Sequence, residues 1–145
     1  MKQLFEKETI YDIAPFNKEA INEICTKESE LLIICSKSDY DEHNELLLKI
    51  SQAIGFEDAS IINLDFDLGQ YFPINELSQR FSSNQILSFG INPKTLGIPA
   101  HLKAHKQYQF ENLSYCYTTS LMKMSSDQNI KKTFWTFAKQ NLVNS

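Results

Sequence analysis

The chain contains five consecutive apolar residues that set strong limits on its fold, Leu31-Leu32-Ile33-Ile34-Cys35. A strand with one face in water would alternate apolar and polar side chains, whereas this run is apolar throughout. It therefore predicts a strand that is covered on both faces, as in the middle of a parallel sheet. Because parallel strands need long crossover connections, we expect helices on both faces of that sheet.

The segments that follow this strand alternate between helical and strand patterns. An apolar stripe at helical spacing predicts a helix that is capped within residues 38–42 and ends at Gly55. Three further elements are predicted after it: a strand at 59–64, a short helix at 74–81 and a strand at 86–89. Two crossovers therefore give the order β-α-β-α-β, with a largely parallel sheet.

The last third of the chain predicts a loop, a hairpin and a helix. Residues 91–106 contain two prolines and a glycine without a clear period, which indicates a long loop. Residues 108–117 read as a hairpin. Ser125 or Ser126 is expected to cap a final helix, whose apolar face comprises Ile130, Phe134, Phe137 and Ala138. The predicted fold class is α/β, a three-layer α/β/α arrangement with a mixed, mostly parallel sheet and a C-terminal hairpin plus helix.

The N-terminal segment differs from the rest of the chain. Residues 1–16 carry scattered apolar side chains with no sustained period, and we interpret them as an arm. Asn17 is a plausible N-cap, so a short helix is predicted over residues 17–27. Residues 17–145 have a suitable length for one α/β domain, and no linker divides them.

Composition argues against several classes of function. The formal net charge is −4 and Arg80 is the single arginine, so strong direct binding of nucleic acid is not expected. No segment approaches the length of apolar residues that spans a membrane, and the N-terminus lacks the apolar stretch of a signal peptide. The odd number of cysteines without a CxxC motif (Cys25, Cys35 and Cys116) fits reduced core residues in a cytoplasmic protein.

The motifs that carry chemistry are incomplete. His101 and His105 lie four residues apart and would share one face of a helix, but the metalloprotease pattern lacks its glutamate, and a solvated basic loop is expected instead. Asp65 and Asp67 follow a predicted strand and are expected to form a turn. There is no GxGxxG, GxxxxGK[ST] or GxSxG motif, so no cofactor, metal or nucleophile site is predicted.

From Leu46 to Leu142 the chain resembles the psi subunit of the bacterial DNA polymerase III clamp-loader assembly. The residues that carry the resemblance are Leu47-Leu48-Lys49-Ile50, Ala53-Ile54-Gly55, Ile86-Leu87-Ser88-Phe89-Gly90, Leu96-Gly97, Ser120-Leu121 and Lys131-Lys132-Thr133-Phe134-Trp135. They match in order and spacing, and none is a catalytic signature. The resemblance implies a non-catalytic α/β connector that binds a chi-like subunit, with an N-terminal peptide that docks on the clamp loader.

Three aromatic residues are the candidates for partner contacts. Phe5 and Tyr11 lie in the arm, which would suit a peptide that folds on binding. Trp135 lies beside the apolar face of the final helix, and large aromatics dominate interface energetics. A protein-binding adaptor of the cytoplasm unrelated to replication is the alternative within this class of function.

A second resemblance points to an enzyme. Gly90-Ile91-Asn92-Pro93 is similar to the GINP motif of mismatch-type uracil-DNA glycosylases, in which the asparagine orients the attacking water. Asn92 would take that role. The chain departs from the family pattern because the motif follows the third predicted strand and continues with Lys94. A pocket with aromatic and polar groups around Asn92 would favour the enzyme, and a filled crevice would favour an adaptor.

Overall fold

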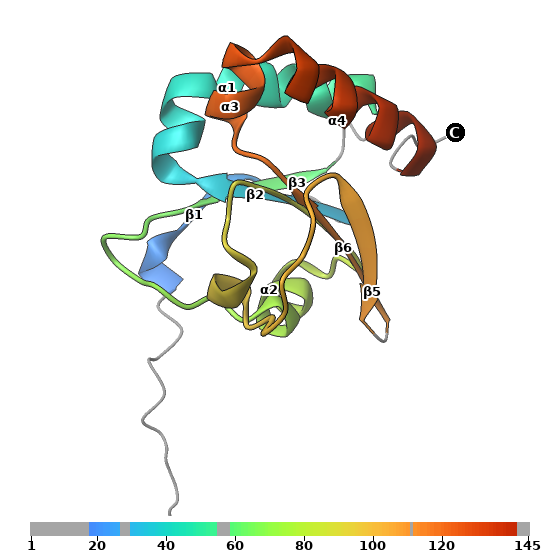
Figure 1. Cartoon of the computed structure of the whole chain (residues 1–145). Coiled ribbons are helices and arrows are strands. Elements are labelled where there is room, and N and C mark those ends of the chain that lie inside the picture. Colours follow the sequence, from blue (N-terminus) through green and yellow to red (C-terminus); the bar gives the residue numbers. More distant parts are fainter. Residues whose placement is uncertain (1–17, 27–29, 55–58, 111, 142–145) are drawn as a thin grey trace, which may run out of the picture.

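The computed structural model describes residues 18–26, 30–54, 59–110 and 112–141. Within these ranges the chain forms a six-stranded sheet of order β1-β3-β2-β4-β6-β5 (Figure 1). The strands are β1 (Ile21–Cys25), β2 (Leu31–Ser36), β3 (Ser60–Leu64), β4 (Gln85–Phe89), β5 (Lys106–Phe110) and β6 (Leu113–Thr118). The four inner strands are parallel, and the edge strands β1 and β5 pair antiparallel with their neighbours.

Helices cover both faces of this sheet. One face carries α1 (Lys37–Ala53), α3 (Leu121–Ser126) and α4 (Gln128–Asn141), and the other carries α2 (Ile74–Phe81) with the 3-10 helix η2 (Pro93–Leu96) (Figure 1). A further 3-10 helix, η1 (Lys18–Ala20), precedes β1. The α/β class, the mixed and mostly parallel sheet and the C-terminal hairpin followed by helices are therefore confirmed.

The strand β2 divides the interior into two hydrophobic clusters. Leu31, Ile33 and Cys35 face α1 and α4, whereas Leu32 and Ile34 face α2. All five side chains have no exposed surface. Burying a side chain of this size contributes about 1.5–3 kcal/mol, so the apolar run is a major source of stability on both faces. The central position predicted for this segment is confirmed.

The start of α1 differs in detail from its prediction. Its N-cap is Ser36, whose hydroxyl accepts the backbone N–H of Asp39 at 3.1 Å, so the cap precedes residues 38–42. The helix ends at Ala53, with Ile54 as the C-cap. Gly55 lies outside the described residues. The helix starts as soon as β2 ends because the same serine closes the strand and caps the helix.

The helix predicted over residues 17–27 is wrong. Where the structure describes this segment, residues 18–20 form η1 and Ile21–Cys25 forms β1, which pairs antiparallel with β3. Pairing with β1 satisfies the outer backbone groups of β3, and it outweighs the weak helical spacing of a short segment. The amide of Asn22 adds a cross-strand hydrogen bond to Asn63 at 2.8 Å.

The predicted cap of the last helix is also wrong. Ser125 and Ser126 end α3, and both hydroxyls donate back to the carbonyl of Met122. The residue that caps α4 is Asp127, whose carboxylate accepts the N–H groups of the second and third residues of that helix at 2.9 and 3.3 Å. A carboxylate serves a helix N-terminus better than a hydroxyl because it also opposes the helix dipole. Among the described residues, no helix combines the length and apolar character needed to cross a membrane.

Candidate functional site

The crevice where α/β sheets commonly bind ligands lies beyond the carboxyl ends of β2 and β4. From β2 the chain passes through α1 to β3 on one side, whereas β4 is followed along the chain by β5 and β6 on the other side. Ligands in this fold class bind where such connections diverge. A recess of about 350 Å³ lies there, lined by Ser36, Ser38, Asp39, Glu42, Gly90, Ser120 and Met122.

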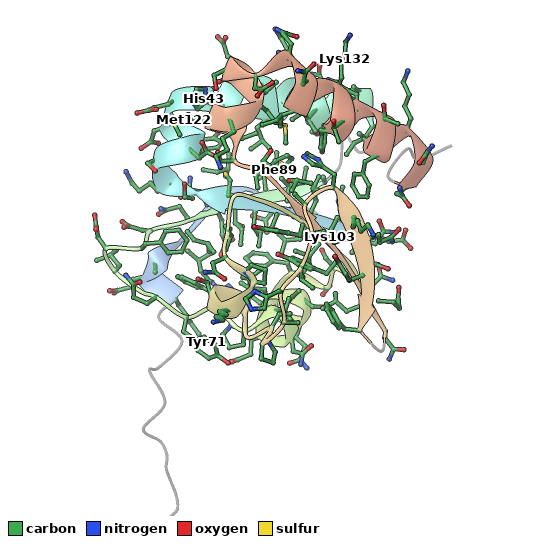
Figure 2. The ribbon with its side chains drawn as sticks, in the orientation of Figure 1. His43, Tyr71, Phe89, Lys103, Met122 and Lys132 are labelled. Atoms are coloured by element: carbon green, nitrogen blue, oxygen red, sulfur yellow. The ribbon has the colours of Figure 1, made fainter. Side chains whose placement is uncertain are left out.

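Asp39 occupies the inner part of this crevice. Its side chain comes from the first turn of α1 and is 8% exposed. One carboxylate oxygen accepts the backbone N–H of Leu121 at 2.7 Å, and the other accepts that of Met122 at 3.1 Å. Met122, labelled in Figure 2, marks the start of α3 over this end of the sheet. A carboxylate at a helix N-terminus is favoured by the dipole and by the unpaired amides there.

Four backbone donors around the crevice, the N–H groups of Asp39, Leu121, Met122 and Lys123, are therefore already paired within the chain. Ser36 takes an N–H at the start of α1, and the hydroxyl of Ser120 takes that of Lys123 in α3 at 3.2 Å. Together with the two amides bound by Asp39, these are the groups that would otherwise hold a phosphate or carboxylate ligand. The geometry favours a junction that joins β2, α1 and α3 over an anion-binding site.

Gly90 brings the second strand end against the same junction. Its φ is +70°, a left-handed conformation that favours glycine. A Cβ atom at this position would lie 2.6 Å from Cβ and 2.8 Å from Cα of Ser120. The backbone N–H of Gly90 donates to the carbonyl of Thr118 at 2.9 Å, which ties the end of β4 to the end of β6.

The cysteine thiols near the junction are unsuited to nucleophilic chemistry. Burial, reinforced by the carboxylates of Asp39 and Asp41, raises the pKa of Cys35 to about 12. Burial also raises the pKa of Cys116 to about 12. Both thiols stay protonated at neutral pH, whereas the thiolate is the reactive form. All three cysteines are free, and Cys25 is half-buried, in agreement with the prediction of reduced residues in the interior.

Asn92 lies at the mouth of a second cleft. This cleft of about 350 Å³ is lined by Gly90, Asn92, Pro93, Lys94, Ala100, His101, Leu102 and Tyr117. The side-chain oxygen of Asn92 accepts the backbone N–H of Lys94 at 3.0 Å and so caps η2. Tyr117 and His101 supply ring surfaces. The cleft has the aromatic and polar lining that would favour an enzyme, while the asparagine oxygen already has a structural partner.

The remaining motifs have structural roles. The segment that contains His101 and His105 is not helical, which agrees with the expected loop, and His105 has a φ of +60°. The carboxylate of Asp65 accepts the N–H of Asp67 at 3.0 Å, which confirms the predicted turn. Among the described residues, no group of three or more His, Cys, Asp or Glu side chains could hold a metal ion.

The aromatic candidates for partner contacts are placed differently from one another. Trp135 is half-buried, and its ring contacts that of Phe134 with centroids 5.4 Å apart. It also lines an apolar recess of about 470 Å³ with Ala53, Ile54, Ala138 and Lys139. It is thus mainly a core residue with one accessible side. Phe5, Tyr11 and the arm lie outside the described residues.

A groove lies between β5 and α4, beside the hairpin. Its volume is about 770 Å³, and its walls are His105, Lys106, Gln107, Tyr108, Gln109, Thr133, Thr136, Phe137, Gln140 and Asn141. Sequence reasoning missed this surface. A signal was available, because the chain after residue 89 has seven lysines and only two acidic residues, Glu111 and Asp127. The overall charge of −4 conceals that asymmetry.

Comparisons with known proteins do not assign the chain to a family. No protein-family model matches the sequence, and no curated protein matches it.

Proposed function

We propose that the chain is a non-catalytic protein-interaction subunit that resembles the psi connector of the DNA polymerase III clamp-loader assembly. The observation that carries the proposal is the pairing of Asp39 with α3, since it uses the amides at the usual ligand position of the fold to hold the protein together. The protonated thiols of Cys35 and Cys116 point in the same direction. These features support a role in binding over one in catalysis.

The proposed partners are a clamp-loader subunit and a chi-like subunit in the cytoplasm. Their support is the resemblance carried by residues 46–142, together with the arm, whose Phe5 and Tyr11 would suit a docking peptide. An arm that orders on binding can wrap a partner surface, although ordering costs part of the interaction energy. A cytoplasmic adaptor outside replication shares the same structural support, so the identity of the captured partners separates the two.

The arm is expected to be necessary for capture of clamp-loader subunits. The full chain and a version without residues 1–16 are compared as baits in native cytoplasm, and bound proteins are quantified by mass spectrometry. We expect roughly tenfold less clamp-loader protein on the truncated bait, because a few aromatic anchors carry most of the energy of such contacts. A bait whose residues 1–16 are scrambled is the matched control. Failure of every bait to retain a replication protein would exclude the psi-like role.

The cleft beside Asn92 supports a second candidate function, base excision from uracil-containing DNA. The supporting observation is the presence of Tyr117 and His101 in the lining, since a flipped base needs ring surfaces and polar groups. The opposing observation is the side-chain oxygen of Asn92, which is engaged with the N–H of Lys94. An asparagine that caps η2 already has a sufficient structural reason for its position.

Replacement of Asn92 by alanine is expected to lower the free energy of unfolding by about 1 kcal/mol, the usual effect of losing an N-cap. Urea denaturation measures this change, and Asn92→Ser is the control because serine can also cap. Duplex DNA with one uracil opposite guanine is then incubated with each variant, and we expect no excision by any of them. Excision by the unmodified chain that disappears in Asn92→Ala would establish the enzyme instead.

A further inference from the structure

His105 carries a buried ring nitrogen, Nδ1, that has no hydrogen-bond partner among the residues that the structure describes. The residue immediately precedes β5, at the point where the long loop enters the hairpin. Buried polar atoms are nearly always paired in native proteins, so an unpaired one calls for an explanation. Because histidine can bind a proton near neutral pH, the state of this ring can change with pH.

The backbone and the ring of His105 contact different elements. Its φ of +60° is a left-handed conformation that few residues other than glycine, asparagine and aspartate adopt. In this conformation its backbone N–H donates to the carbonyl of Tyr117 in β6 at 2.7 Å. Its ring lies edge-on against that of Phe134 in α4, with centroids 6.2 Å apart and an angle of 64° between the ring planes. The residue therefore connects the hairpin to the last helix.

Phe134 links this contact to the packing of α4 on the sheet. Its ring is fully buried and lies against the rings of Phe89 and Trp135, with centroids 5.7 and 5.4 Å away. His105 also lines the groove of about 770 Å³ between β5 and α4 (Figure 1). A change in the position of the histidine ring would therefore alter both the groove and the packing around Phe134.

The titratable groups around His105 offer no negative charge to a protonated ring. β5 contributes Lys106 and Tyr108 to the groove, and the neighbouring titratable residues of β6 are Cys116 and Tyr117. The wall formed by α4 has no titratable group among its described residues, which are Thr133, Thr136, Phe137, Gln140 and Asn141, and the lysines of this helix (Lys131, Lys132 and Lys139) do not line the groove. Lys106 is positively charged at neutral pH, and a like charge disfavours protonation of the histidine.

Binding of a proton to His105 is therefore unfavourable in this arrangement. An imidazolium carries an N–H on both ring nitrogens, and the N–H at Nδ1 would lack an acceptor among the described residues. Burial accordingly lowers the pKa of His105. A histidine released to water has the ordinary pKa of about 6.5, so it binds a proton more readily than the packed one. The packed arrangement is thus favoured above that pH and loses stability as the pH falls through the lower pKa of the folded state.

We propose that His105 is a pH-sensitive contact between the hairpin and α4, and that the groove between β5 and α4 opens when its ring binds a proton. The charged ring turns away from Phe134 to reach water, and α4 then loses a neighbour on the hairpin side. The hairpin stays paired, because the hydrogen bond from the N–H of His105 to Tyr117 does not involve the ring. The inference goes beyond the proposed interaction role and does not depend on it.

The single tryptophan of the chain, Trp135, can report the change because its ring contacts that of Phe134. The purified full chain is titrated from about pH 8 to about pH 5, a range in which histidine is the side chain that ordinarily titrates. Quenching of the tryptophan fluorescence by acrylamide is measured at each pH. We expect the quenching constant to rise roughly twofold on acidification as the packing around Phe134 loosens, while circular dichroism shows that the chain remains folded. Imidazole resonances in NMR spectra should give His105 a titration midpoint below the ordinary value of about 6.5.

Three variants assign the change to one histidine. Asparagine tolerates a positive φ and does not titrate, so His105→Asn should stay folded and show no rise in quenching on acidification. His101→Asn is the matched control, because this exposed histidine lies in the same loop. His43→Gln is the control for α1, which covers the same face of the sheet as α4. Both control variants should show the same rise in quenching as the unmodified chain.

Four results would overturn the proposal: no rise in the unmodified chain, a rise that persists in His105→Asn, loss of the rise in either control variant, or an NMR midpoint of His105 at or above about 6.5. The NMR midpoint is measured on the unmodified chain, so it tests the proposal even if His105→Asn is unstable. The titration is also independent of the capture experiment with residues 1–16, and failure of one leaves the result of the other valid.

Discussion

Replacement of Gly90 by alanine is expected to lower the free energy of unfolding by about 2–5 kcal/mol. Two costs add at this position. A residue with a Cβ atom at a φ of +70° is strained by about 1–2 kcal/mol. The new atom would also lie 2.6 Å from Cβ of Ser120, so the ends of β4 and β6 must move apart. Urea denaturation monitored by circular dichroism measures the loss.

Gly97 provides the matched control for this prediction. It has a φ of +79°, close to that of Gly90, but the nearest atom to an added Cβ is the hydroxyl oxygen of Tyr71 at 3.1 Å. A ring end can shift where a backbone cannot, so Gly97→Ala should cost only the backbone strain of about 1–2 kcal/mol. Equal losses in the two variants would show that contact between Gly90 and Ser120 does not contribute to stability.

Local patterns in the sequence identified the elements that are stabilised by their own residues. The run of residues 31–35 is apolar on both faces because helices cover both faces of the sheet. The unbroken apolar pattern therefore predicted correctly that both faces of this strand are buried. The apolar spacing of Ile74, Leu77 and Phe81 placed α2 correctly, because these three side chains form its buried face. In both elements, the pattern within a few residues matches the environment that the fold supplies.

Features that depend on residues far apart in the sequence could not be predicted from local patterns. β1 has a short sequence compatible with helix, and it becomes a strand because the outer backbone groups of β3 are available to it. Asp39 looked like an ordinary acidic residue in a first turn, yet its partners are the amides of Leu121 and Met122. The groove between β5 and α4 likewise forms only when the hairpin and the last helix are assembled.

The hydrogen bonds at the crevice also explain why the position that usually binds a ligand in this fold class has a structural role in this chain. Three helix-start residues converge there: Ser36 caps α1, Ser120 caps α3, and Asp39 connects the two helices. Each contact uses a backbone donor that cannot then bind a ligand.

Replacement of Asp39 by alanine is expected to lower the free energy of unfolding by about 3 kcal/mol. The carboxylate accepts two backbone N–H groups, and hydrogen bonds to a charged group contribute about 1.5–3 kcal/mol each when little water can replace them. Asp39→Asn keeps one acceptor oxygen and should lose roughly half as much. Urea denaturation gives the stability change, and hydrogen exchange should show faster exchange of the amides of Leu121 and Met122 than in the unmodified chain.

Asp41 supplies the control, because it lies two residues further along the same helix and pairs only with Lys37 across an exposed surface at 3.1 Å. Exposed pairs at this spacing add little to stability, so Asp41→Ala should leave the unfolding midpoint unchanged and should not alter exchange at α3. If both variants were equally destabilised, the loss would reflect the acidic first turn of α1 as a whole. If exchange at Leu121 stayed slow in Asp39→Ala, packing of α3 on α1 would hold the junction without the carboxylate.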